Sequence, residues 1–190
     1  SVKSFKNIEE LINCSDGLHV VTPTPLHHEI AIECLKKNKD IFIEKPIANT
    51  IKEAEEIVNL SKKNKNIVQI GHIERFNSTI NQLKTIIKNP HFIEIERLAP
   101  FQSRGAEVPV VLDLMVHDID LLLLLIKSKI KKISASGASI LTNSIDMANA
   151  RIEFERGETA NLTASRISLK QMRQMRVFQK NSYSVLDFQA

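Results

Sequence analysis

The chain has 190 residues, 43% of them hydrophobic and 25% charged, and a formal net charge of +4 at pH 7. These proportions are typical of a globular protein with one good core or two small ones. Aromatic residues are few, Trp is absent, and the lysines are scattered without forming a basic stripe. The composition therefore does not favour nucleic-acid binding.

Membrane association and metal binding are not indicated either. The longest apolar run, Leu121 to Ile126, is far shorter than the roughly 20 residues that a membrane-spanning helix needs. No secretory signal opens the chain, so we expect a cytoplasmic protein with no membrane partner. Cys14 and Cys34 have neither metal-ligand nor redox spacing. We interpret both as reduced structural thiols and expect no metal site.

The first seventy residues alternate between helical and strand patterns. Apolar spacing predicts helices around Ile8–Ile12, from His27 to about Asn38, and after Thr50, which forms a capping box with Glu53. Short apolar runs predict strands at Gly17–Val21, Asp40–Ile43 and Ile67–Ile70. This βαβαβ order predicts a parallel sheet with right-handed crossovers, which is a partial Rossmann-like α/β fold.

From Phe76 the pattern changes to that of a second, α+β domain. Helices are predicted through Ile80–Ile87 and over Val111–Ile126. Apolar and polar residues alternate on both sides of Arg156-Gly157, which predicts an antiparallel hairpin. Strands are expected at 92–98, 133–141, 148–155, 160–165, 172–179 and 182–188. We therefore predict an open, mainly antiparallel sheet, and we place the two domains at residues 1–74 and 75–190.

A glycine-rich turn is absent from the sequence. Dinucleotide-binding domains hold the pyrophosphate at such a turn, before the first helix. This chain has five glycines and no Gly-x-Gly. It begins as if part-way through such a domain, so we expect about 60 residues of that domain to precede Ser1.

Chemically useful side chains follow the predicted parallel strands. They are Thr22, Pro23 and His27 after the first strand, Glu44 and Lys45 after the second, and Arg75 after the third. Because the carboxyl ends of parallel strands border the crevice where α/β sheets bind ligands, we interpret these residues as ligand-binding. The alternative for Glu44 and Lys45 is a solvated ion pair at a strand end.

A second group of candidates belongs to the later domain. Asp113, His117 and Asp120 lie at i, i+4 and i+7, which places them on one face of a helix. A carboxylate one turn from an imidazole can fix its tautomer and raise its basicity, so His117 is a candidate general base. A packed or capping histidine is the alternative.

Two arginines flank the loop that precedes this helix. Arg97 and Arg104 are candidates to clamp a phosphate or carboxylate, because a guanidinium binds such groups with two parallel hydrogen bonds. A solvated surface role for both is the alternative.

Six motifs occur in order over nearly the whole chain. They are Val21-Thr-Pro-x-x-x-His27, Ala31 through Leu35, Glu44-Lys45-Pro46, Glu53-Ala54, Gly71-His72-x-x-Arg75-Phe76 and Asp113-x-x-x-His117-x-x-Asp120. Together they resemble the Gfo/Idh/MocA oxidoreductases. The resemblance implies a sugar or cyclitol dehydrogenase that uses NAD or NADP and forms a homodimer or homotetramer through its antiparallel sheet.

The same resemblance implies roles for the candidate residues. The catalytic set maps onto Lys45, Asp113 and His117. Coenzyme binding falls to Thr22, Pro23, His27, Glu44, Lys45 and Arg75, and substrate binding to Arg75, Arg97, Arg104 and Asp120.

A narrower resemblance concerns the substrate. The segments Gly71–Asn77, Arg97–Phe101 with Arg104-Gly105, and Val110–Asp120 resemble the subgroup that oxidises UDP-N-acetylglucosamine at C3. We therefore expect a nucleotide-sugar dehydrogenase. The alternative is a non-catalytic, dehydrogenase-like scaffold that keeps the oligomerising sheet but lacks coenzyme binding, and the absent glycine-rich turn favours it.

Overall fold

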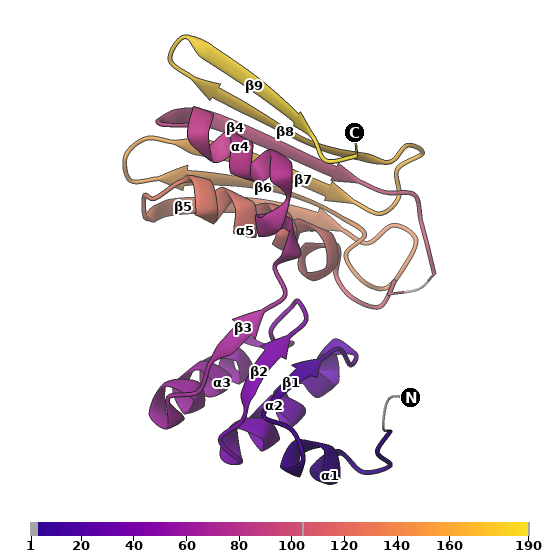
Figure 1. Cartoon of the computed structure of the whole chain (residues 1–190). Coiled ribbons are helices and arrows are strands. Elements are labelled where there is room, and N and C mark those ends of the chain that lie inside the picture. The colour runs from indigo at the N-terminus through magenta and orange to yellow at the C-terminus, as the bar shows by residue number, and fades with distance from the viewer. Residues whose placement is uncertain (1–3, 104, 190) are drawn as a thin grey trace. The chain divides into compact units, whose positions relative to one another are not determined.

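The computed structural model describes residues 4–103 and 105–189. Its internal contacts divide the chain into two compact units, Ser1–His72 and Ile73–Ala190 (Figure 1). Each unit has a hydrophobic core of its own, as expected for a domain. No helix in the described ranges is long and apolar enough to cross a membrane.

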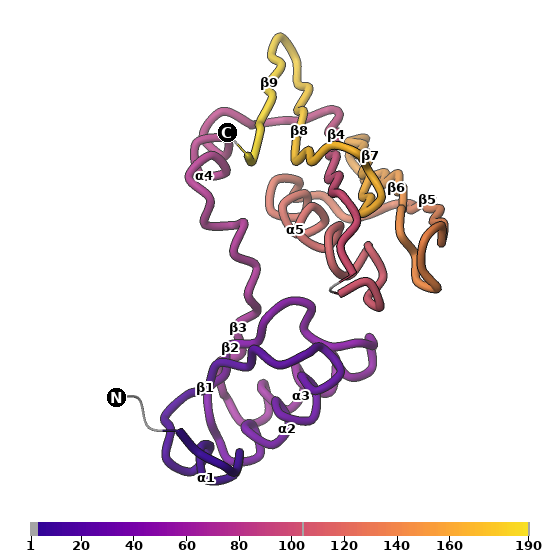
Figure 2. Tube along the Cα trace, turned by 90° about the vertical axis from the view of Figure 1, so that its right-hand side faces the viewer, coloured from indigo at the N-terminus to yellow at the C-terminus, as the bar shows by residue number. Residues whose placement is uncertain are grey.

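The first unit is a three-stranded parallel sheet with helices packed on it. Its strands are β1 (Gly17–Val20), β2 (Asp40–Ile43) and β3 (Val68–Ile70), in the order β1-β2-β3. Its helices are α1 (Ile8–Asn13), the short η1 (Thr24–Leu26), α2 (His27–Lys36) and α3 (Ile51–Asn64). Helices α2 and α3 pack side by side on the sheet (Figure 2). The predicted parallel, Rossmann-like arrangement is confirmed.

The capping box predicted before α3 is present. The Thr50 hydroxyl accepts a hydrogen bond from the Glu53 backbone N–H at 3.2 Å, and the Glu53 carboxylate accepts one from the Thr50 N–H at 2.9 Å. These two bonds satisfy donors that would otherwise be orphaned at the helix start. Ile57 from α3 then joins Leu35 and Ile43 in the core of this unit.

The second unit is a six-stranded sheet with helices over one face. The strand order is β5-β6-β7-β4-β8-β9. The strands are β4 (Pro90–Leu98), β5 (Ile130–Ala138), β6 (Met147–Phe154), β7 (Thr159–Ser165), β8 (Met172–Gln179) and β9 (Ser182–Asp187). All neighbours are antiparallel except β4 and β7. The predicted open, mainly antiparallel sheet is therefore confirmed, although its parallel pair was not predicted.

Buried and exposed residues alternate along the strands of this sheet, and the alternation identifies the face that packs into the core. The β6–β7 hairpin turns at Gly157, whose φ of 97° suits glycine. The buried alternating positions are Ala148, Ala150, Ile152 and Phe154 on β6, and Ala160, Leu162 and Ala164 on β7. Helices α4 (Ser78–Ile86) and α5 (Val116–Leu125) cover that face, and no helix of the described residues lies on the other face (Figures 1 and 2).

The helix predicted over Val111–Ile126 is not continuous. It starts with a π-helical turn, η3 (Val111–Met115), and α5 follows it. A π turn bonds residue i to i+5, and its wider turn changes the angle between the Asp113 and His117 side chains from the angle in an α-helix. Apolar and charged residues are also not divided between a buried and an exposed side of this helix. Leu123 is 43% exposed, whereas Asp118 and Asp120 are buried beside Leu121 and Leu122.

Candidate functional site

The carboxyl ends of β1 and β2 lie next to each other in the first unit. Val20 pairs with Ile43, and the Glu44 N–H donates to the Val20 carbonyl at 3.0 Å. The Glu44 carboxylate lies over Gly71, where an added Cβ would come within 2.9 Å of Oε2. Only glycine leaves that space free. Glu44 is therefore held above the end of the sheet by a close backbone approach from the segment after β3.

His27 connects the segments that follow β1 and β2. Its side chain is 1% exposed, and its ring nitrogens lie 2.9 Å from the Pro46 carbonyl oxygen (Nδ1) and 2.8 Å from that of Thr22 (Nε2). Both nitrogens are thus used inside the unit. This geometry gives His27 the role of positioning the Thr22 and Pro46 segments, while its part in coenzyme binding stays a prediction.

The other strand-end candidates remain near the surface. Pro23 is exposed and Lys45 is half-buried, with a cis peptide bond to Pro46. The Thr22 Oγ1 atom is shielded from solvent and has no hydrogen-bond partner among the described residues. Buried hydroxyls are normally satisfied, so a partner from outside the chain fits at this atom. Its place beyond the carboxyl ends of parallel strands is where a dinucleotide binds.

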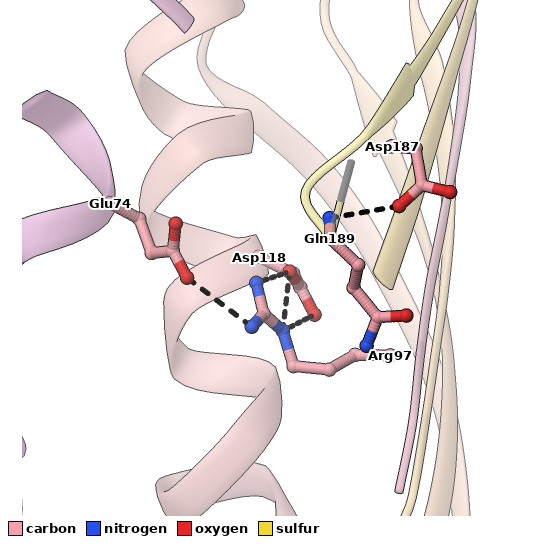
Figure 3. Close-up of polar contacts among 5 residues, drawn as sticks. All are labelled: Glu74, Arg97, Asp118, Asp187 and Gln189. Carbon is pink, nitrogen blue, oxygen red and sulfur yellow. Dashed lines mark hydrogen bonds and ion pairs between the residues drawn. The ribbon is translucent and has the colours of Figure 1, made fainter. Parts of the chain in front are cut away.

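In the second unit, a buried ion pair joins β4 to α5. Arg97 donates from Nε to both Asp118 carboxylate oxygens at 3.0 Å and from Nη2 to Oδ1 at 2.7 Å (Figure 3). Its Nη1 reaches Glu74 at 3.4 Å. Arg97 and Asp118 are 3% and 1% exposed. Neither the predicted substrate clamp nor a solvated role fits Arg97, because carboxylates of this same unit already neutralise its guanidinium.

Burial and pairing act against each other in this ion pair. Burial raises the pKa of Asp118, and the hydrogen bonds from Arg97 oppose that rise. Burial also disfavours the charge on Arg97, but its bonds to Asp118 and Glu74 prevail and raise its pKa. Removal of either partner would therefore leave an uncompensated buried charge and destabilise the folded unit.

A second ion pair attaches the same helix to the segment η2 (Ile73–Phe76). Arg75 donates to Asp120 from Nε at 2.7 Å and from Nη2 at 2.5 Å, and this bonding raises the pKa of Arg75. The Asp120 side chain is 8% exposed and that of Arg75 is 47% exposed. Asp120, which we predicted to bind substrate, thus anchors Arg75. This pair fixes η2 to α5, and the ion pair of Glu74 with Arg97 fixes η2 to β4.

Asp113 and His117 sit at the start of the helix that these ion pairs hold. Asp113 belongs to η3 and His117 to the first turn of α5, and both are half-buried. Asp113 lines a cavity of about 170 Å³ together with Arg166 and Arg173. Arg104, the other predicted clamp, lies outside the described residues.

The Asp146 carboxylate organises the loop between β5 and β6. Burial opposes its ionisation, but hydrogen bonds from the backbone of Ile140, Leu141 and Thr142 and from the Thr142 hydroxyl prevail and hold its pKa well below the usual range. The Asp146 carbonyl accepts from the Arg166 N–H at 3.0 Å. The carboxylate therefore orders the loop beside β6 that holds Arg166.

Sequence reasoning missed Asp118, although the pattern contains a signal for it. Asp118 precedes Leu122 by four residues and Ile126 by eight, so it falls on the apolar stripe of α5. Arg97 likewise continues the buried alternation of Ile93 and Ile95 on β4. Two opposite charges at apolar positions of neighbouring elements are a recognisable signature of a buried pair.

Comparison with known proteins places this fold and these motifs in one class, the nicotinamide-dependent oxidoreductases. Residues 1–72 match the oxidoreductase family with an NAD-binding Rossmann fold, and residues 69–181 match the GFO/IDH/MocA C-terminal domain. The chain belongs to the GFO/IDH/MocA oxidoreductase family.

Named relatives include enzymes that act on phosphorylated sugars. UDP-N-acetylglucosamine 3-dehydrogenase from Acidithiobacillus ferrooxidans is 34% identical over 98% of this chain, which spans 60% of that relative. A solved structure of that enzyme matches 98% of this chain and 62% of its own with a TM-score of 0.93. Glucose-6-phosphate 3-dehydrogenase from Bacillus subtilis is 37% identical over 46% of this chain and 25% of its own length.

Removal of the Asp118 charge should destabilise the second unit. We expect Asp118→Asn to lower the free energy of unfolding by about 3–5 kcal/mol, because it leaves Arg97 buried without its main counter-charge. Chemical denaturation followed by circular dichroism measures this change.

The matched control is Glu96→Gln, which removes a carboxylate from an ion pair with Arg176 that is about one-third exposed. That change should cost only about 0–1 kcal/mol. Equal small losses in both variants would contradict a structural role for the Arg97–Asp118 pair.

Proposed function

We propose that this protein is a nicotinamide-dependent oxidoreductase that transfers a hydride between a secondary alcohol of a sugar and NAD or NADP. Asp113 and His117 carry the proposal, because they lie about a turn apart at the start of a helix fixed by two ion pairs. Such fixation holds a base in one orientation. The family match supports the class of reaction.

The chemistry of alcohol oxidation explains the residue types. A secondary alcohol releases its carbon-bound hydrogen as hydride only as its hydroxyl proton leaves, so a base and a positive charge are required. His117 takes the proton. Lys45 supplies positive charge where the alkoxide develops, and Asp113 contacts substrate hydroxyls or orients His117.

The coenzyme half of the proposal rests on the first unit. Thr22, Pro23, Glu44 and Lys45 lie at the carboxyl ends of β1 and β2, and the buried Thr22 hydroxyl is free to bond a ligand. Arg75 was also expected to bind coenzyme, and its side chain is 47% exposed beside Asp120. The nicotinamide supplies the hydride acceptor when it is bound.

We propose UDP-N-acetylglucosamine, oxidised at C3, as the substrate. Support comes from the 34% identity to UDP-N-acetylglucosamine 3-dehydrogenase, which extends over 98% of this chain. The segments that carry the narrower resemblance include Arg75, Arg97 and the Val110–Asp120 run. These segments contain the residues of the ion-pair framework, which are Glu74, Arg75, Arg97, Asp118 and Asp120.

We also propose that the protein is a homodimer or homotetramer formed through the helix-free face of the six-stranded sheet. Phe92, Phe178 and Tyr183 form a row of ring contacts across β4, β8 and β9, with centroids 5.9 and 4.9 Å apart. Tyr183 and Val185 are 56% and 49% exposed. An aromatic row next to charged residues is typical of an interface.

Replacement of His117 tests the proposed base. We expect His117→Asn to lower the turnover of UDP-N-acetylglucosamine with NAD⁺ by about 10²–10⁴-fold, because the hydroxyl proton loses its acceptor. The absorbance of the reduced coenzyme measures the rate. His91→Asn, at an exposed position of β4, is the matched control and should leave the rate unchanged. Equal rates for both variants would dismiss His117 as the base.

A charge placed on the aromatic row tests the proposed assembly. Tyr183→Asp should shift the sedimentation coefficient to that of a smaller species, because a carboxylate in an apolar interface is not solvated. Leu169→Asp, at a fully exposed site off the sheet, should not shift it. A wild-type protein that already sediments as a monomer would contradict the assembly.

A further inference from the structure

Two arginines in the second unit are not neutralised by the described part of the chain. Arg166 is 6% exposed, and its Nη1 and Nη2 donate to the carbonyl oxygens of Gly105 and Val108. Its Nε is buried with no hydrogen-bond partner among these residues. Carbonyl dipoles do not cancel a full charge, and a buried guanidinium without a counter-ion is costly.

Arg173 is the second of these arginines. It pairs across the sheet with Arg97, and both follow the buried alternation Ile93, Ile95 on β4 and Val177, Met175 on β8. Asp118 binds Arg97 and makes no ion pair with Arg173. Within the described ranges, Arg173 has no ion-pair partner. Asp118 therefore bonds directly to only one of the two adjacent arginines and acts on Arg173 only at longer range.

Both arginines line one small cavity. Arg166 and Arg173 surround it with Asp113, Gln102 and Gln171, and its volume is about 170 Å³. This volume is below the roughly 300–1,000 Å³ of a typical ligand pocket, so it suits one group of a larger molecule. Two arginines against one carboxylate leave its lining positive, and the glutamines add neutral hydrogen-bonding groups.

We propose that this cavity is an anion subsite in which Arg166 and Arg173 bind a phosphate or diphosphate of the sugar substrate. The inference rests on the proposed function and deepens it. A guanidinium fork binds phosphate oxygens with paired, charge-assisted hydrogen bonds, and the unpartnered Nε of Arg166 supplies one donor. Asp113 repels an anion, so it faces the sugar hydroxyls while the phosphate lies at the arginine end.

The subsite explains how a family that includes dehydrogenases of sugars and cyclitols can select a phosphorylated sugar. A neutral cyclitol would leave both guanidinium groups without an anion, and the buried charge of Arg166 without an anionic partner penalises the wrong ligand. Arg166 and Arg173 therefore take the role that the sequence had suggested for Arg97, whose charge Asp118 neutralises.

Calorimetric titration of the chain tests the subsite without the need for turnover. The probes are inorganic pyrophosphate, UDP-N-acetylglucosamine and NADH. We expect Arg173→Gln to weaken the binding of pyrophosphate and of the nucleotide sugar by about tenfold or more, as for the loss of a charge-assisted pair. The affinity for NADH should not change. Arg166→Lys, which keeps the charge but loses the fork, should weaken the same two probes.

The control is Arg176→Gln, which removes the same charge from the same strand on the opposite face, where Arg176 pairs with Glu94 and Glu96. It should change no affinity by more than about twofold. Thermal unfolding of each variant verifies that it is folded, and Arg173→Lys should retain part of the affinity if Arg173→Gln unfolds.

The outcomes separate this subsite from the proposed function. Unchanged nucleotide-sugar affinity in both folded variants at Arg173 would overturn the subsite, even if the protein oxidises the sugar. A matching loss of NADH affinity would overturn it too, because the phosphate would then belong to the coenzyme. Loss of pyrophosphate binding in a protein that oxidises no sugar would support the subsite and reject the proposed function.

Discussion

The buried ion pair between Arg97 and Asp118 is the constraint on which the second unit depends. It joins the central region of the sheet to α5, at the residue directly after His117. Hydrophobic contacts alone allow a helix to slide or rotate on a sheet, whereas a bidentate bond between two buried charges has one satisfactory geometry. With Arg75–Asp120 two residues further along α5, about half a turn away, the orientation of α5 is fixed from two sides. A histidine that acts as a base needs such fixation, since its reach is that of one hydrogen bond.

The arginines around the Arg97–Asp118 pair differ in how far carboxylates neutralise them. Arg97 is fully compensated, while Arg166 and Arg173 beside it are not, so the interior of the unit has a neutral framework next to a positive cavity. Asp146 contributes indirectly, because its carboxylate orders the loop that holds the Arg166 backbone. This arrangement fits the phosphorylated sugar that we propose as the substrate.

Much of the architecture could be predicted from local patterns. The strands of both sheets follow apolar runs or strict alternation, and the capping box at Thr50 marked the start of α3. The π turn at Val111–Met115 could not be predicted, because nothing in the local spacing distinguishes it from an α turn. The roles of individual arginines were also beyond sequence reasoning. Burial and partner choice at Arg97, Arg166 and Arg173 arise from strand order and register, which bring together residues far apart in the chain. His27 shows the same limit, since its two carbonyl partners exist only once β1 and β2 are paired.

Transfer of an isotope from the sugar to the coenzyme tests the central claim most directly. The protein is incubated with NAD⁺ or NADP⁺ and UDP-N-acetylglucosamine that carries deuterium at C3, and both products are analysed by mass spectrometry. The proposed reaction breaks the C3–deuterium bond and delivers the deuterium to the nicotinamide, while the hydroxyl proton leaves to the base. Deuterium in the reduced coenzyme, together with a 3-keto sugar, is the result we predict. A sugar that keeps its deuterium, with no reduced coenzyme formed from either nicotinamide, would contradict the account.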